Sequence, residues 1–430
     1  MNRWTTMSTI AATNCALALL GACGGSDDDN DAAPVTITVA GPNVVSQWNE
    51  IAATTINLPA AATGTPEEQQ PVYPVDMATV QIAVYDAVMA IVGAYKPYAY
   101  TPPALSSGAS QEAAVASAAY RVLLALFPAR SASYQSAYDT YIASLAAGTA
   151  KDEGIAVGAA SAAAILALRA NDGRWTPVPA YVPGIGPGQF RGLNPVSRTG
   201  QYIKPFAVTS NSQFRAPGPP ALTSATYAAD FNETMTLGSA TSTTRTAEQT
   251  EIARFYTEAP PTYWARNLRT FAMTNRSVAK HARLLALLQV VQADAANTCF
   301  ESKYYFQFWR PTSAITLADT DGNAATTADP AWTPVVPTPN HPEYPGAHSC
   351  LTGAAAATLQ SYYGTPNITF DWNSAITGTT HHFTTTQALV DEVQLGRIAG
   401  GMHFRTSTVD GAALGKNVAD WVLAHNFQAR

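Results

Sequence analysis

Charged side chains are scarce in this chain of 430 residues. Lysine, arginine, aspartate and glutamate together make up 13% of it, and the formal net charge is −6. Four of the acidic residues lie in one short stretch, Asp27–Asp31, so the remainder is close to neutral. The sequence therefore lacks the basic surface that nucleic-acid binding requires.

Long apolar runs are also missing beyond the N-terminal residues. We expect no membrane-spanning helix after position 22, because a span needs about 20 consecutive apolar residues. Hydrophobic residues nevertheless make up 47% of the chain, which excludes a disordered protein and predicts a sizeable core. The length allows one large domain or two ordinary ones.

The N-terminus has the pattern of an export signal. Arg3 gives a weak positive start, and residues 15–20 form an apolar run that is too short for a permanent span. Residues 20–23 resemble a bacterial lipobox, which implies cleavage before Cys23, a lipid anchor on that residue, and location in the periplasm or cell envelope. An ordinary signal peptide with a chance cysteine is the alternative.

Four cysteines are present. Cleavage would remove Cys15 and lipidation would occupy Cys23, which leaves Cys299 and Cys350 in an oxidising compartment. We expect these two residues to form a disulfide, and two unrelated buried thiols are the alternative.

Hydrophobic periodicity divides the rest of the chain into helices and two long irregular segments, 171–222 and 316–345. We expect a signal peptide over 1–22, a polar tether over 23–35 and a single catalytic domain over 36–430. The expected helices begin near Asp76 and continue at 110–127, 131–147, 151–170, 224–236, 247–258, 262–273, 277–309, 347–362, 385–399 and 409–427. Strand-like alternation is rare, so the predicted class is all-α, with packed helical bundles and long irregular connections. A loop as long as 171–222 is typical of a functional or wrapping segment.

Lys303 and Arg310 belong to the first of three unusual segments. They are seven residues apart, so a continuous helix would place them on one face, and Pro311 disfavours continuation beyond Arg310. Two cations beside aromatic residues favour an anion. A snorkelling surface pair is the alternative.

His348 belongs to the second segment, His341–Cys350. An alanine-rich helical pattern follows it, which places Pro345 and Gly346 at a helix N-terminus. Free backbone N–H groups at such a terminus hold oxyanions, and His348 would lie within reach of the anion. A capping or packing histidine is the alternative.

Arg397 and His403 belong to the third segment. Six residues separate them, which does not fit one straight helical face, and Gly400-Gly401 can bend the chain between them. A histidine placed by a glycine break is a better candidate for function than one inside a regular helix.

Together the three segments resemble the signature of the vanadium haloperoxidase and type-2 phosphatidic acid phosphatase superfamily, in its bacterial haloperoxidase-like branch. That signature is Lys, six residues, Arg-Pro; then Pro-Ser-Gly-His; then Ser-Arg, five residues, His. The matching residues are Lys303, Arg310, Pro311, Pro345, His348, Arg397 and His403, within residues 299–411.

The resemblance assigns the chemistry to two histidines. His403 would be the apical ligand of vanadium in vanadate, or the phosphohistidine nucleophile of a phosphatase, and His348 would be the acid–base residue. Members with the pattern His-any-any-any-Asp have a carboxylate that orients the last histidine, and Ser407 has that place here. Asp410 either takes this part after a three-residue shift or is a surface or capping residue.

The same resemblance assigns the oxyanion to cationic side chains. Lys303, Arg310 and Arg397 would neutralise the equatorial oxygens of vanadate, or of phosphate in a phosphatase, and the Gly346 N–H would donate to one of them. Gly346-Ala347 replaces the Ser-Gly of the signature. The lost hydroxyl is expected to weaken anion affinity by about 1.5–3 kcal/mol.

Other candidate residues carry weaker signals. His341 stands where chloroperoxidases of the family tend to have Phe and bromoperoxidases His, which favours bromide or iodide. His381-His382 lacks the ligand spacing of a zinc site and is expected at a cavity wall or the surface. Trp264 and Trp309 are expected in the core.

The resemblance implies a vanadium-dependent haloperoxidase, which uses hydrogen peroxide to oxidise bromide or iodide to hypohalous acid and so halogenates an organic acceptor. A phosphomonoester phosphatase acting through a phosphohistidine is the first alternative. A non-catalytic, anion-binding surface lipoprotein is the second. No nucleic-acid partner is expected, and only the lipid at Cys23 would contact a membrane.

Overall fold

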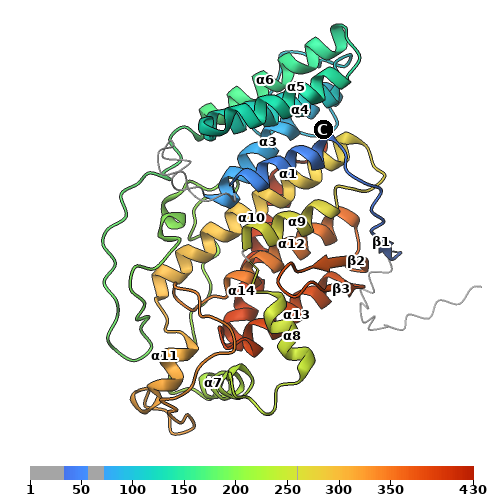
Figure 1. Cartoon of the computed structure of the whole chain (residues 1–430). Coiled ribbons are helices and arrows are strands. Elements are labelled where there is room, and N and C mark those ends of the chain that lie inside the picture. The colour runs from blue at the N-terminus through green and yellow to red at the C-terminus, as the bar shows by residue number, and fades with distance from the viewer. Residues whose placement is uncertain (1–32, 57–71, 259) are drawn as a thin grey trace, which may run out of the picture. The chain divides into compact units, whose positions relative to one another are not determined.

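The computed structural model describes residues 33–56, 72–258 and 260–430. The expected signal peptide, Cys15, Cys23 and the first part of the tether lie outside these residues. Ala33–Arg430 form one compact unit, in which helices predominate, as the sequence predicts (Figure 1). The α-helices are α1 (Val44–Ile56), α3 (Tyr73–Val92), α4 (Gln111–Leu126), α5 (Ser131–Ser144), α6 (Thr149–Arg169), α7 (Ala225–Gly238), α8 (Ala247–Phe255), α9 (Pro260–Thr270), α10 (Val278–Phe306), α11 (Pro311–Thr316), α12 (Ala347–Tyr363), α13 (Thr386–Ala399) and α14 (Arg405–His425).

Most predicted helices agree with the structure to within a few residues, whereas α1 and α11 were not predicted. The end of α10 differs from the prediction. The helix stops at Phe306, and Gln307 adopts a left-handed conformation with φ 48°. Lys303 is therefore in the last turn of α10, whereas Arg310 precedes α11 as its N-cap residue. The prediction that the two cations share one helical face is wrong, because the helix ends between them.

Helix α3 is long and apolar enough to cross a membrane by length and composition, contrary to the expectation from the sequence. In the structure 94% of its apolar window is buried inside the protein. It packs against α4, α6 and α10. Apolar residues all around a helix are typical of a central core helix, and this packing accounts for the composition of α3.

A small three-stranded sheet lies beside the helices and was not predicted. Its strands are β1 (Val35–Thr36), β2 (Ile368–Asn373) and β3 (Thr380–Phe383), in that order. Strand β2 is parallel to β1 and antiparallel to β3. Alternate residues of β2 are buried, which fits a sheet with one face on the core.

Helix α10 connects two groups of helices. It contacts α3, which packs with α4 and α6, and it also contacts α12 and α14 (Figure 1). Helices α12 and α14 approach each other closely at glycines. A Cβ atom on Gly415 would lie 1.9 Å from the Cys350 carbonyl oxygen, and one on Gly353 would lie 2.2 Å from that of Ala412. This packing fixes α12, which begins within the second sequence segment, against α14, which begins just after His403 of the third.

Substitution of Gly415 by alanine is expected to destabilise the protein. The added methyl group would force α12 and α14 apart, and overpacking of this kind costs about 1–3 kcal/mol. Thermal unfolding of Gly415→Ala should therefore begin well below that of the wild type. Gly108→Ala is the matched control, because a Cβ atom there meets nothing within 4 Å. Equal melting temperatures for the two variants would contradict the close approach.

Candidate functional site

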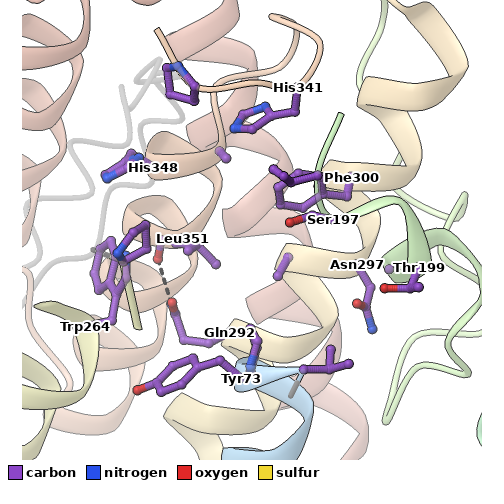
Figure 2. Close-up of a pocket in the computed structure, with 18 of the residues that line it drawn as sticks. Tyr73, Ser197, Thr199, Trp264, Gln292, Asn297, Phe300, His341, His348 and Leu351 are labelled. Atoms are coloured by element: carbon purple, nitrogen blue, oxygen red, sulfur yellow. Dashed lines mark hydrogen bonds between the residues drawn. The ribbon is translucent and has the colours of Figure 1, made fainter. Parts of the chain in front are cut away.

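A cavity of about 810 Å³ lies where the second and third sequence segments meet. His341, His348, Arg397 and His403 line it, and Figure 2 shows His341 and His348 together at one end. The irregular segment 171–222 supplies part of another wall through Ser197, Thr199 and Gly200. The segment is therefore a wrapping one, as its length predicts.

The local structure at each histidine follows from the sequence. His348 lies in the first turn of α12, after the N-cap residue Gly346. Arg397 is in the last turn of α13, and His403 lies in the short connection to α14. Gly401 makes this connection with φ 74°, and a Cβ atom there would lie 2.6 Å from the Gly238 carbonyl oxygen. The glycine break predicted from the sequence is confirmed.

His403 is held by partners on both ring nitrogens. Its Nδ1 lies 2.9 Å from Glu343 Oε1, and its Nε2 lies 3.2 Å from Arg310 Nη1. Because the guanidinium only donates and the carboxylate accepts, these partners assign the proton to Nδ1 and a lone pair to Nε2. His403 Nε2 is thus a nucleophilic or metal-binding atom at the cavity wall.

Glu343 is the carboxylate that orients His403, and the sequence analysis missed it. Its Oε1 also accepts from the Phe404 N–H at 2.9 Å, and its Oε2 accepts from the Ser407 hydroxyl. Asp410 instead accepts a hydrogen bond from Tyr344 at 2.5 Å. The alternative in which Asp410 orients His403 is therefore wrong. The sequence feature that could have identified this carboxylate is the acidic residue at 343, between two prolines of the second segment.

Arg310 joins all three segments. Its Nε donates to the His341 carbonyl oxygen at 2.8 Å, and its Nη1 donates to that of Met402 at 2.9 Å. Its Nη2 lies 2.9 Å from His341 Nδ1, so the ring accepts there. Burial, followed by the charge of Arg310, holds the pKa of His341 well below its usual value, which makes His341 a neutral residue of the site.

Lys303 lies beneath the loop that carries Glu343. Its ammonium donates to the carbonyl oxygens of Pro342 at 3.0 Å and Glu343 at 2.9 Å, and to that of Pro345. These bonds occupy the three donors of an ammonium group, and Lys303 is not among the residues that line the cavity. Lys303 therefore does not bond an anion in the cavity directly, contrary to the role expected from the sequence. The residue contributes its charge and fixes the loop.

At the histidine end of the cavity, Arg397 and His348 each have a polar atom without a partner among the described residues. Arg397 donates through Nη1 to the Tyr256 carbonyl oxygen at 3.0 Å, but its buried Nε is unpartnered. The buried Nε2 of His348 is also unpartnered. Unsatisfied buried polar groups are costly and uncommon, so their presence at the cavity indicates a polar ligand. Together with His403 Nε2, they fit a tetrahedral oxyanion such as vanadate.

The Gly346 N–H does not face this ligand position. It donates to the Ser407 carbonyl oxygen at 2.8 Å, so the assignment of this group to the anion is wrong. A Cβ atom on Gly346 would lie 3.3 Å from the same oxygen, because α14 passes directly beside the loop. With no side-chain cap on α12, the N–H groups of its first turn replace Gly346 as candidate donors.

The cavity end is rich in buried positive charge. Burial lowers the pKa of Arg397 to about 9, and Arg310 beside it lowers that pKa further. Burial also lowers the pKa of Arg310 to about 10 and that of Lys303 to about 8. Burial raises the pKa of Glu343 to about 7, against the Ser407 hydrogen bond and the nearby cations. A bound anion would relieve this excess of buried cations.

The cysteine prediction is wrong in this structure. Cys299 and Cys350 are both buried free thiols. They lie within hydrogen-bonding contact of each other, and Cys299 also faces the Pro345 carbonyl oxygen at 3.9 Å. The two thiols thus bring α10 and α12 into contact without a covalent bond.

Of the remaining candidate residues, only Trp264 lines the cavity. His381 is held between Glu392 and Glu251, and His382 is exposed beside Asp371. Trp309 is buried in the core, as predicted, whereas Trp264 is buried and also lines the cavity.

Comparison with known proteins agrees with this geometry. Residues 283–429 match the family of the VCPO second helical-bundle domain. The vanadium chloroperoxidase of Curvularia inaequalis is 27% identical over 198 residues, which are 38% of this chain. The chain spans only about a third (32%) of the length of that relative.

Two solved structures share the fold over nearly the whole chain. A bacterial vanadium-dependent iodoperoxidase is 23% identical, with a TM-score of 0.72 over 90% of this chain and 95% of the other. A holo-type bacterial vanadium-dependent chloroperoxidase is 15% identical, with a TM-score of 0.68 over 89% and 95%. Residues 283–429, which carry Arg310, His348 and His403, are similar to the VCPO second helical-bundle domain, and the likeness to the solved structures shows that the chain has the fold of the vanadium haloperoxidases.

Proposed function

We propose that this protein binds vanadate and uses hydrogen peroxide to oxidise bromide or iodide. The observation that carries the proposal is the excess of buried cations around the lone pair of His403 Nε2. Arg397 lines the cavity and its Nε has no partner among the described residues, and Arg310 Nη1 lies 3.2 Å from His403 Nε2. Fixed cations of this kind stabilise an oxyanion without reorganisation.

Each residue has a task in this proposal. His403 Nε2 would bond the vanadium, while Glu343 keeps its Nδ1 protonated. Arg310 and Arg397 would hold vanadate oxygens, with Lys303 adding charge from beneath the loop. Bound vanadate would supply Lewis-acid activation of hydrogen peroxide. The net reaction is X⁻ + H₂O₂ + H⁺ → HOX + H₂O.

His348 would move the proton. Burial, followed by the charge of Arg397, holds its pKa well below the usual value, so the ring is neutral and its free Nε2 can accept a proton from incoming peroxide. His341 lies beside Arg310 at the same end and would act on the halide. The proposed preference for bromide or iodide over chloride rests on His341, since the similar proteins include an iodoperoxidase and two chloroperoxidases.

The test of the function compares vanadate-free protein with protein reconstituted with vanadate. We expect peroxide consumption with iodide and bromide only after reconstitution. Hydrolysis of p-nitrophenyl phosphate that vanadate inhibits, with no halide oxidation, would instead assign a phosphatase. Tight binding of the anion with neither reaction would assign a non-catalytic anion-binding protein.

His348→Ala is expected to separate proton transfer from anion binding. Its halide oxidation should fall by about 10²–10⁴-fold, the usual range for a general acid–base residue. Its vanadate affinity, measured by calorimetry, should change far less, because the cations and His403 remain. A loss of affinity as large as the loss of turnover would show that His348 acts as an anion ligand.

We further propose that the protein is an exported lipoprotein anchored at Cys23. The support is the apolar run and the lipobox-like residues 20–23, which lie outside the described residues. Export would place the enzyme where hydrogen peroxide, halide and an organic acceptor reach it from outside the cell.

A further inference from the structure

Exposed apolar side chains are concentrated in one segment of the chain. Half of the large hydrophobic residues that the described part of the chain exposes lie within residues 175–202, and the three most exposed are among them. These three are Ile185, which is 87% exposed, Val182 at 80% and Leu193 at 71%. Single exposed apolar side chains need no explanation, whereas a concentration of them is typical of an interaction site.

The most exposed residues belong to one closed loop, residues 179–198, which we call the apolar loop. Arg191 donates to the Ile185 carbonyl oxygen at 2.7 Å. Arg198 donates to the Pro179 carbonyl oxygen, which joins the two ends of the loop. The exposed apolar side chains are therefore presented together by one folded element.

The apolar loop is fixed to the body of the protein. The Phe190 N–H donates to the Gln307 carbonyl oxygen at 2.7 Å, and the Asn340 side chain donates to the Leu193 carbonyl oxygen at 2.7 Å. Figure 1 shows the surrounding segment, in green, along one side of the helices. A partner would therefore bind a backbone that is already ordered, which lowers the entropic cost of binding.

The same part of the chain carries positive charge only. Residues 173–229 contain five lysines and arginines and no acidic residue, in a chain whose net charge is −6. Two of the five, Arg174 and Arg215, are bound to carboxylates. Arg191, Arg198 and Lys204 form no ion pair with any described residue. Unpaired cations thus accompany the exposed apolar side chains.

This combination matches the surface of a bilayer that contains anionic lipid. Such a surface attracts nearby lysines and arginines and takes apolar side chains into its interface. Arg198 lies over the Tyr181 ring, 5.6 Å from its centre, and tyrosine rings are enriched at membrane–water interfaces. A second copy of this chain fits less well, because a two-fold contact through the loop would set its cations against themselves.

We propose that the apolar loop docks the folded domain on a bilayer that contains anionic phospholipid. Val182 and Ile185 would enter the interface, and the three unpaired cations would face the headgroups. The docking is independent of the proposed reaction and of a lipid at Cys23, because side chains of the folded domain provide it. Val196 belongs to the loop and also lines the cavity, so docking would hold the cavity beside the lipid surface.

The test is cosedimentation with vesicles of phosphatidylcholine, with and without phosphatidylglycerol. The protein used is Ala33–Arg430, which forms one compact unit and lacks the candidate anchor. We expect binding only with phosphatidylglycerol, and weaker binding as salt screens the charges. Val182→Ser/Ile185→Ser should weaken binding by about tenfold or more, because apolar burial is lost. Lys204→Gln should weaken it by roughly fivefold, the usual contribution of one cation near an anionic bilayer.

Val39→Ser/Ile376→Ser is the matched control, since these residues are 52% and 59% exposed outside the apolar loop. No binding of the wild type to phosphatidylglycerol, equal binding to phosphatidylcholine alone, or equal losses in the control and the loop variant would overturn the proposal. A wild-type dimer in sedimentation velocity that the loop variant dissociates, with no lipid binding, would assign the loop to a second copy and also overturn it. Circular dichroism checks each fold, and Lys204→Gln keeps the test decisive if the loop variant misfolds.

Discussion

His403→Ala is expected to lose vanadate-supported halide oxidation almost completely. The variant keeps Arg310 and Arg397, so it can still attract an oxyanion, but it lacks the Nε2 lone pair that would bond the metal. The loss should exceed the roughly 10²–10³-fold that follows removal of one donor from an oxyanion site. Halide-dependent peroxide consumption at saturating vanadate measures it.

A second readout separates loss of the bond from loss of the fold. Elemental analysis after gel filtration should find vanadium retained by the wild type and lost from His403→Ala. His382→Ala is the matched control, because its ring is exposed and pairs with Asp371 outside the cavity. If His403→Ala retained both vanadium and turnover, His403 would not be the metal ligand.

Glu343→Gln is expected to weaken vanadate binding by roughly 10–100-fold, the usual effect of removing the residue that orients a metal-bound histidine. Glutamine keeps the size of the side chain but not the charge that holds the Nδ1 proton of His403. The double variant Glu343→Gln/Ser407→Asp should recover much of the loss, because Ser407 already contacts Glu343. Asp410→Asn is the control, since Asp410 pairs with Tyr344.

The pH dependence distinguishes orientation by charge from a structural role. The pKa of Glu343 is raised to about 7, so the carboxyl is neutral below that pH and ionised above it. Vanadate affinity of the wild type should therefore increase as pH rises through about 7. The step should be absent in Glu343→Gln, whereas the ionisation of vanadate itself affects both proteins alike. An identical pH profile for the two proteins would exclude the orienting role.

The sequence predicted the parts of the site that depend on local spacing. Neighbouring residues predict both the helix start before His348 and the glycine break before His403, and the structure confirms both features. The predicted end of α10 failed because Gln307, a residue without obvious turn preference, adopts the left-handed conformation.

The partners of each side chain could not be predicted, because they depend on how distant segments pack. Glu343 reaches His403 across 60 residues, and Lys303 is drawn to loop carbonyl oxygens some 40 residues away. The Gly346 N–H donates to a carbonyl oxygen of α14. Hydrophobic periodicity predicts that α14 is a helix, but not that it packs beside Gly346. The wall formed by Ser197 and Thr199 comes from a segment with no hydrophobic period at all.

The buried cations described above also allow more than one tetrahedral anion to occupy the site. A ligand that binds only the folded protein stabilises it by mass action, and phosphate has the same tetrahedral shape and charge sign as vanadate. Arg310 and Arg397 therefore do not distinguish the two anions. In the proposed function, selection would rest with a bond from His403 to vanadium. In a medium rich in phosphate the resting protein would contain phosphate, and scarce vanadate would enter by exchange.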